Sequence, residues 1–218
     1  MNILIVISSK SPNDILYVCI QCLYHIQILN DKENIYTVCI VDSDSDNFDV
    51  YMKIQEDFPF VTIIFPKNTN YEYGAWKIAY SIFSNYDIYF CIQDSVIIER
   101  FIPLSLVNDT NAFTFHHESG FHSHIETKEI AVEILNNSTL DQDKVKGLID
   151  TPFNLAQHSS FIVTKNVIND IFTKITQPPV NKDGSCTYER IFGIYFLVHN
   201  INTFNLYDFF TKIHGNRS

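Results

Sequence analysis

Hydrophobic and polar residues alternate in blocks along the first hundred positions of the chain. Four short runs rich in Ile, Val and aromatic residues have the continuous apolar character of strands buried on both faces: residues 3–7, 36–41, 60–65 and 87–92. The segments between them have the mixed pattern of helices: residues 14 to about 29, 48–57 and 71–83. This alternation of strand and helix predicts a parallel, doubly wound α/β sheet with right-handed crossovers.

The second half of the chain follows a less regular pattern. It predicts strands at 112–115, 161–164 and 203–207, and helices at 128–135, 142–148, 167–175 and 188–199. A loop with Pro and Gly at 177–185 comes before the last of these helices. Because no linker or internal repeat interrupts the pattern, we expect one domain over residues 1–218, with a ligand-binding half at 1–100. Residues 101–218 are expected to extend the sheet and build the opposite wall of the site.

The predicted topology brings four loops together. In a doubly wound parallel sheet, ligands bind beyond the carboxyl ends of the strands, so the loops after residues 7, 41, 65 and 92 should converge on one crevice. These loops carry small, polar and acidic side chains: Ser8, Asp42, Asp44, Asn70, Gln93, Asp94 and Ser95. The sequence therefore predicts a polar binding site at this edge of the sheet.

The composition narrows the choice of ligand and compartment. The net charge of −10, with no run rich in Lys or Arg, argues against nucleic acid as a partner. An acidic protein can still bind a nucleotide when a divalent cation screens the phosphates. The odd number of five Cys residues, some within apolar runs, favours free thiols in a reducing compartment. With no apolar run long enough to span a membrane, we expect a cytoplasmic protein, in the host cytoplasm if it is viral.

Three motifs can carry chemistry at the predicted crevice. Asp42, after the second strand, can accept hydrogen bonds from a ribose or a pyrimidine ring, or cap the next helix. Gly74, at the start of the following helix, permits close approach of a phosphate to exposed amides, and Lys77 can supply charge there, whereas Trp76 is expected in the core. Asp94 can hold a Mg²⁺ or Mn²⁺ that bridges two phosphates, or cap a helix.

These blocks, in this order, resemble GT-A glycosyltransferases. The block Asn-x-x-Tyr-Glu-Tyr-Gly-Ala-Trp at 68–76, Gln-Asp-Ser at 93–95 and Gln-His-Ser-Ser-Phe-Ile-Val-Thr-Lys at 157–165 look like those of the rhamnan-synthesis (RgpF-like) group. Small GT-A enzymes of large DNA viruses are similar in length and layout. The resemblance implies a single GT-A domain, with a Rossmann-like, mostly parallel sheet flanked by helices. The chain departs from the pattern because Asn70 replaces a Gly and Asp94 is only half of an Asp-x-Asp motif.

The resemblance also implies an activity and a set of site residues. The activity is transfer of a sugar from a nucleotide-diphosphate sugar, a UDP- or TDP-hexose or a rhamnose donor, to a glycan or glycoprotein acceptor. The donor would contact the polar residues of the four loops together with Tyr73, Gly74 and Lys77. A Mn²⁺ or Mg²⁺ ion would be held by Asp94 and His214, and Lys212 or Arg217 could clamp the leaving phosphate. A frayed terminus is the other interpretation of this segment.

An inverting transfer needs a carboxylate that takes the proton of the acceptor hydroxyl. Glu189 is the first candidate, because GT-A enzymes often carry their base at a comparable place, and Asp150 is the second. The other interpretation of Glu189 is a favourable charge near a helix N-terminus, beside Arg190. Two other functions remain open. One is a catalytically inactive nucleotide-sugar-binding module, and the other is a nucleotidyltransferase, although residues 8–14 lack the Gly-rich, basic loop expected of that class.

Overall fold

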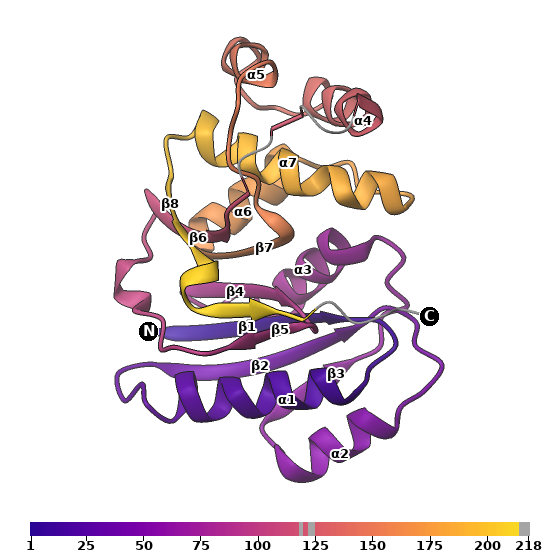
Figure 1. Cartoon of the computed structure of the whole chain (residues 1–218), viewed down its shortest axis with the longest axis vertical. Helices are drawn as coiled ribbons and strands as arrows, with labels where there is room; N and C mark the ends of the chain where they lie inside the picture. Colours follow the sequence, from indigo (N-terminus) through magenta and orange to yellow (C-terminus); the bar gives the residue numbers. More distant parts are fainter. Residues whose placement is uncertain (118–119, 122–124, 214–218) are drawn as a thin grey trace.

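A computed structural model describes residues 1–117, 120–121 and 125–213 of the chain (Figure 1). Its main sheet has seven strands in the order β3-β2-β1-β4-β7-β6-β8. The strands are β1 (Asn2–Ser9), β2 (Ile35–Asp42), β3 (Val61–Ile64), β4 (Ile88–Gln93), β6 (Asn111–Phe115), β7 (Gln157–Thr164) and β8 (Asn202–Asn205). A separate antiparallel ribbon joins β5 (Val96–Ile98) to β9 (Phe210–Lys212).

The first half of the sheet has the predicted parallel topology. β1 pairs in parallel with both β2 and β4, and β2 pairs in parallel with β3. The apolar runs form these strands because both faces of the sheet are covered, as the full burial of residues 3–7 reflects. The second half turns back, since β7 lies antiparallel to β4 and β6 antiparallel to β7, while β8 is parallel to β6. The mostly parallel α/β fold class is confirmed.

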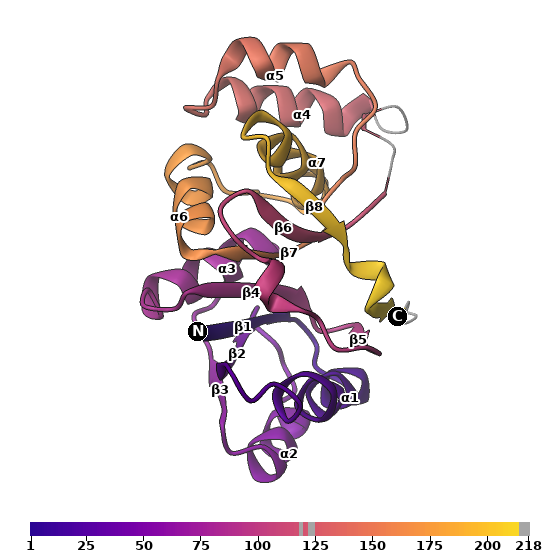
Figure 2. The same ribbon diagram turned by 90° about the vertical axis from the view of Figure 1, so that its left-hand side faces the viewer.

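Helices cover both faces of the sheet (Figures 1 and 2). Leu4 and Val6 point to one face, where they share a core with the helices at 165–174 and 182–198. Ile3, Ile5 and Ile7 point to the other face, where they share a core with the helices at 14–28 and 49–57 and with the β5–β9 ribbon. The helices are α1 (Asp14–Cys22), η1 (Leu23–Ile28), α2 (Asp49–Asp57), α3 (Tyr71–Ile82), α4 (Ile125–Asn136), α5 (Gln142–Ile149), α6 (Lys165–Lys174) and α7 (Lys182–Val198), with short 3₁₀ turns η2 (Leu104–Leu106) and η3 (Leu206–Asp208).

Most element boundaries fall within a few residues of the prediction, and the exceptions have local causes. The helix expected at 188 begins at Lys182, because Asn181 caps it through a hydrogen bond from the Gly184 N–H to Asn181 Oδ1 (2.8 Å). The loop predicted at 177–185 is therefore too long. β5 and β9 were missed, since three-residue strands carry almost no periodic signal. None of the helices in the described ranges is long and apolar enough to cross a membrane.

Candidate functional site

The carboxyl ends of β1, β2 and β4 meet at one edge of the sheet, here called the C-terminal edge. Ser9 lies opposite Asp42, and Ser8 lies opposite Gln93. The Ser9 hydroxyl donates to Asp94 Oδ2 at 3.0 Å, and the Asp94 N–H donates to the Ser8 carbonyl at 3.1 Å. The predicted convergence of these loops is therefore observed, and Asp94 is held directly beside the end of β1.

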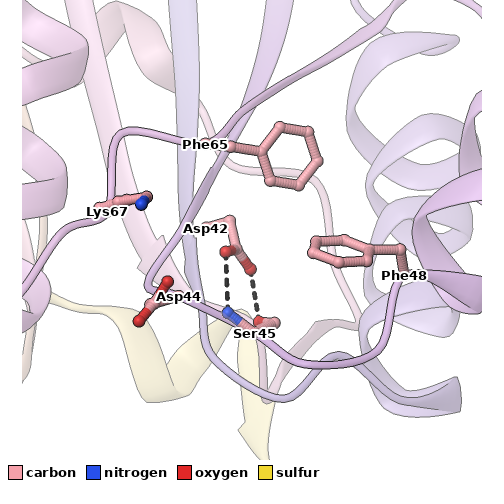
Figure 3. A pocket seen from close by; sticks show the side chains of 6 residues that line it. All are labelled: Asp42, Asp44, Ser45, Phe48, Phe65 and Lys67. Atoms are coloured by element: carbon pink, nitrogen blue, oxygen red, sulfur yellow. Dashed lines mark hydrogen bonds between the residues drawn. The ribbon is translucent and has the colours of Figure 1, made fainter.

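A pocket of about 330 Å³ opens at the ends of β2 and β3 (Figure 3). The rings of Phe48 and Phe65 stand on one side, 5.4 Å apart between centroids, and the side chains of Asp44 and Lys67 on the other. Both residues are about half exposed (44% and 53%), so the two adjacent rings leave apolar surface open to solvent in the pocket. Flat aromatic surface beside carboxylate and ammonium groups suits a planar ligand with polar edges, such as a nucleobase.

Asp42 forms the floor of this pocket and is almost fully buried. Its carboxylate accepts hydrogen bonds from the Ser45 N–H (3.0 Å), the Ser45 hydroxyl and the Tyr51 hydroxyl (2.7 Å). Burial and the neighbouring carboxylate both raise the pKa of Tyr51, so its hydroxyl keeps its proton and donates. Asp42 therefore fixes the turn that carries Asp44 and Ser45, rather than capping α2, whose N-cap is Phe48.

The loop before α3 is tied to the β2 loop through Asn68. The Asn68 amide donates to the Ser43 hydroxyl (3.1 Å) and to the Tyr71 carbonyl (2.7 Å), and its oxygen accepts from the Asn70 N–H (3.0 Å). Gly74 lies directly against this amide, because a Cβ at Gly74 would stand 2.1 Å from Asn68 Oδ1. The absence of a side chain at Gly74 therefore makes room for Asn68.

The other predicted residues of this motif point elsewhere. Asn70 reaches across to residue 179, where its amide donates to the Pro179 carbonyl at 2.9 Å. Tyr73 is buried and donates to the Ile175 carbonyl at 2.6 Å, so the structure places it in the core. Lys77 is exposed and lies over the Tyr73 ring, 5.5 Å from its centroid. Neither Tyr73 nor Lys77 is brought to the pocket.

A network of polar side chains connects β4 to α3, α7 and β9. The Gln93 amide donates to Glu72 Oε1 at 2.7 Å, and the Ser185 hydroxyl donates to Glu72 Oε2 at 2.9 Å. Lys212 donates to Gln93 Oε1 at 2.6 Å and to the Ser95 hydroxyl, so its ammonium group contacts the residues on both sides of Asp94. The sequence suggested Lys212 or Arg217 as a clamp for the leaving phosphate, and Arg217 lies outside the described residues. The role of Glu72 and the β5–β9 ribbon that brings Lys212 to this position were not predicted, because so short a ribbon leaves no sequence signal.

The predicted metal site was tested against the donor groups of the described residues. Within those ranges no three His, Cys, Asp or Glu side chains lie close enough together to hold a metal ion. His214, the second predicted ligand, lies outside the described residues. Mg²⁺ is commonly bound by one or two carboxylates together with substrate phosphates, a role that a single Asp94 carboxylate fits.

Glu189 lies in the third turn of α7, and not at the helix start as expected. It is half-buried, and its Oε1 accepts a hydrogen bond from the backbone N–H of His158 at 2.9 Å. Burial raises the pKa of Glu189, the His158 N–H and the Arg190 guanidinium lower it, and the nearby Glu72 carboxylate raises it. A carboxylate with a raised pKa is suited to accepting a proton.

Asp150, the second candidate base, lies elsewhere. It follows α5, is exposed, and forms a 2.6 Å ion pair with Lys128 of α4. Helices α4 and α5 form the layer beyond α7 (Figure 1), so the structure does not bring Asp150 together with the strand-end residues.

Strained backbone gathers at the same edge. Of the described residues other than Gly, seven have positive φ, and only Asn200 is outside the loops and strand ends that surround the site. The others are Ser11, Asp44, Lys67, Tyr71, His158 and Ser159. Such conformations persist only where the surrounding structure holds them, and they are concentrated at binding and catalytic sites. This observation supports a functional site here independently of the side chains.

No known family model matches the sequence, and no curated protein matches it by sequence. The fold does match solved structures, among them that of a mannosyltransferase. That structure is the mannosyltransferase PcManGT from Pyrobaculum calidifontis in complex with GDP-Man and Mn²⁺, with a TM-score of 0.53 and 10% sequence identity. The likeness covers 93% of this chain and 54% of that chain, so this chain spans about half of the mannosyltransferase. At this identity the likeness establishes the fold.

Proposed function

We propose that this protein is a glycosyltransferase that uses a nucleotide-diphosphate sugar. The observation that carries the proposal is the order of chemical groups along the C-terminal edge. The first is the aromatic and acidic pocket at the ends of β2 and β3. The second is the Asp94 carboxylate, with the Lys212 ammonium group bonded to the residues on either side of it. The third is the half-buried Glu189 carboxylate, whose pKa is raised. These three environments correspond to a nucleobase, a diphosphate and an acceptor hydroxyl. The shared fold with a mannosyltransferase in complex with GDP-Man and Mn²⁺ supports the same conclusion.

In this mechanism the base of the donor stacks in the pocket between residues 42 and 67. Lys212 stabilises the negative charge of the diphosphate, and Asp94 would hold the divalent cation, Mn²⁺ or Mg²⁺. That cation supplies Lewis-acid stabilisation of the leaving nucleotide when it is bound. Glu189 takes the proton of the acceptor hydroxyl as its oxygen attacks the anomeric carbon. The bond from that carbon to the diphosphate oxygen breaks, and the nucleoside diphosphate leaves. The configuration at the anomeric carbon of the transferred sugar is inverted.

The donor and acceptor follow from likeness and chemistry. A UDP- or TDP-hexose or a rhamnose donor remains the proposed donor class, and GDP-mannose belongs in the test panel because the similar structure contains it. The proposed acceptor is a glycan or a glycoprotein, and we place the protein in the cytoplasm. The likeness to the rhamnan-synthesis group and to viral enzymes stays a prediction.

The test is a titration of nucleotide sugars by calorimetry, with and without Mn²⁺, followed by measurement of nucleotide release. We expect one donor to bind and to be turned over. Asp94→Asn should weaken metal-dependent binding, and Glu189→Gln should lower turnover about a hundredfold while leaving donor binding intact. Asp150→Asn is the matched carboxylate control and should match the wild type in both measurements.

Two outcomes would overturn the proposal. Binding of no donor in the panel would exclude a nucleotide-sugar site at this edge. Binding without turnover under any acceptor would instead favour a catalytically inactive nucleotide-sugar-binding module, which the incomplete Asp-x-Asp motif keeps as the second candidate. A nucleotidyltransferase would be revealed by release of pyrophosphate from a nucleoside triphosphate.

A further inference from the structure

The second and third residues of strand β7 are both in the left-handed region. His158 has φ of 61° and Ser159 has φ of 50°, and neither is a Gly. The pairing of β6 with β7 is irregular at the same place, with a register shift between Thr114 and Phe115. Because left-handed backbone is disfavoured for residues with a Cβ, other contacts have to hold this bulge in place.

The contact that closes the bulge comes from Trp76 of α3. Its indole N–H donates to the Ser159 carbonyl at 2.9 Å, and the ring is fully buried. The Ser160 hydroxyl donates to the His158 carbonyl at 3.1 Å, and the His158 ring lies 3.0 Å from the Tyr207 hydroxyl. The sequence predicted a core role for Trp76, but its only polar atom bonds to the backbone of the bulge.

The bulge directs a backbone donor at the proposed catalytic carboxylate. The His158 N–H points out of the β-ladder and donates to Glu189 Oε1 at 2.9 Å. The strand entry also holds the backbone of the same residue, because the Ala156 N–H donates to the Glu189 carbonyl at 2.9 Å. Gly193, one turn further along α7, allows this approach, since a Cβ there would stand 2.6 Å from the Asn154 carbonyl oxygen.

From these contacts we propose that Trp76 is a positioning residue for Glu189, and that it acts through the left-handed pair His158–Ser159. The chain of contacts runs from the Trp76 indole to the Ser159 carbonyl, then along the bulge to the His158 N–H and the Glu189 carboxylate. Its catalytic consequence rests on the proposed function, because Glu189 acts as a base only if the protein transfers a sugar. The positioning itself is a property of the free protein and can be measured without a substrate.

Several groups besides the His158 N–H face Glu189 and set the pH at which it ionises. They come from three elements: Glu72 of α3, Lys182, Cys186 and Arg190 of α7, and Tyr207 of η3. Trp76→Phe removes the indole donor but keeps an aromatic ring, so these charged groups are retained. The bulge then relaxes, the His158 N–H turns away, and the loss of a donor to the charged carboxylate raises the pKa of Glu189.

The experiment follows the Glu189 carboxylate in the free protein by difference infrared spectroscopy or carbon NMR, with Glu189→Gln as the blank. We expect Trp76→Phe to move its titration to higher pH. The matched control is Tyr89→Phe, which likewise removes a side-chain donor to a backbone carbonyl and keeps an aromatic ring. The donor lost is the Tyr89 hydroxyl, bonded to the Phe83 carbonyl at 2.6 Å, and the Glu189 titration should be unchanged. Ser160→Ala, a milder change on the same bulge, should shift the titration in the same direction as Trp76→Phe.

A second variant tests whether the strain is what Trp76 opposes. Gly adopts the left-handed region without strain, so adding His158→Gly to Trp76→Phe should return the Glu189 titration toward the wild-type value. With a substrate in hand, Trp76→Phe should lower kcat about tenfold or more with the donor KM unchanged, and move the acidic limb of the pH profile upward.

The results separate this proposal from the proposed function. If the Glu189 titration in both Trp76→Phe and Ser160→Ala coincides with that of the wild type, the positioning role is wrong, whether or not the protein transfers a sugar. If the titration shifts as expected but no donor is turned over, the contacts position a carboxylate that is not a glycosyltransferase base, and the proposed function fails.

Discussion

Replacing Gly74 with Ala should disturb the binding edge from inside the protein. A Cβ at this position would lie 2.1 Å from Asn68 Oδ1 and 2.7 Å from Asn70 Cβ, and real Cβ atoms do not come so close. Gly74 is buried in the first turns of α3, so the helix has no room to move away. The Asn68 side chain has to shift, and its bonds to the Ser43 hydroxyl and the Tyr71 carbonyl are lost or stretched.

The expected cost combines two terms. Overpacking at a buried site costs about 1–3 kcal/mol, and each lost hydrogen bond about 0.5–1.5 kcal/mol. Some of the strain is relieved when Asn68 moves, so the free energy of unfolding should fall by roughly 2–4 kcal/mol. For a domain of this size, about 2–4 °C in Tm per kcal/mol implies a fall of roughly 4–16 °C.

The measurement is thermal unfolding by circular dichroism, together with calorimetric binding of the donor that the panel identifies. Gly147→Ala is the matched control, because nothing lies within 4 Å of the added Cβ in the exposed face of α5. It should be neutral or stabilise the protein by about 0.5–1 kcal/mol through helix propensity. If Gly74→Ala unfolds at the wild-type temperature, the close approach of Asn68 is not a constraint, and this description of the loop is wrong.

Two further predictions concern the pocket and Glu189. Phe65→Ala should weaken donor binding about tenfold, since stacking on an aromatic ring contributes about 1–3 kcal/mol per base. Phe101→Ala is the control and should have no effect, because Phe101 is also exposed but does not line the pocket. Equal affinities by calorimetry for Phe65→Ala and the wild type would contradict the nucleobase assignment. For Glu189, the pKa is raised in the folded state, so the folded protein binds more protons between the ordinary pKa of 4.5 and the raised value, and the free energy of unfolding falls as the pH rises through that interval. Urea unfolding across this range should show a shallower decline for Glu189→Gln, and an identical pH dependence would contradict the raised pKa.

Local pattern carried the fold prediction furthest in the first half of the chain. The strands and helices between Asn2 and Gln93 lie within a few residues of the predicted positions, because continuous apolar runs and amphipathic segments are long there and end at clear breakers. The prediction of elements was less accurate in the second half of the chain, where a bulge interrupts β7 and α7 begins earlier than expected. The bulge at His158 and the start of α7 at Lys182 depend on contacts with distant residues, which local pattern does not contain.

Some residues of the candidate site could be predicted from the sequence, and others could not. Ser8, Asp42, Gln93 and Asp94 could be found from the sequence, because topology alone brings the carboxyl ends of parallel strands to one edge. Tyr73 could not be excluded in advance, since a Tyr in a motif beside a predicted site looks the same whether its hydroxyl faces a ligand or the Ile175 carbonyl.

The sequence by itself determined the α/β class, the parallel order of the first strands and the edge at which polar residues gather, since these follow from hydrophobic periodicity and from the handedness of the chain. Tertiary structure decided which side chains act together. Lys212 reaches the residues beside Asp94 through a three-residue strand, and Trp76 reaches Glu189 through the left-handed bulge of β7. The hydrogen bonds from Trp76 to Ser159 and from Lys212 to Gln93 join residues more than eighty positions apart. Each of them depends on the packing of the whole chain.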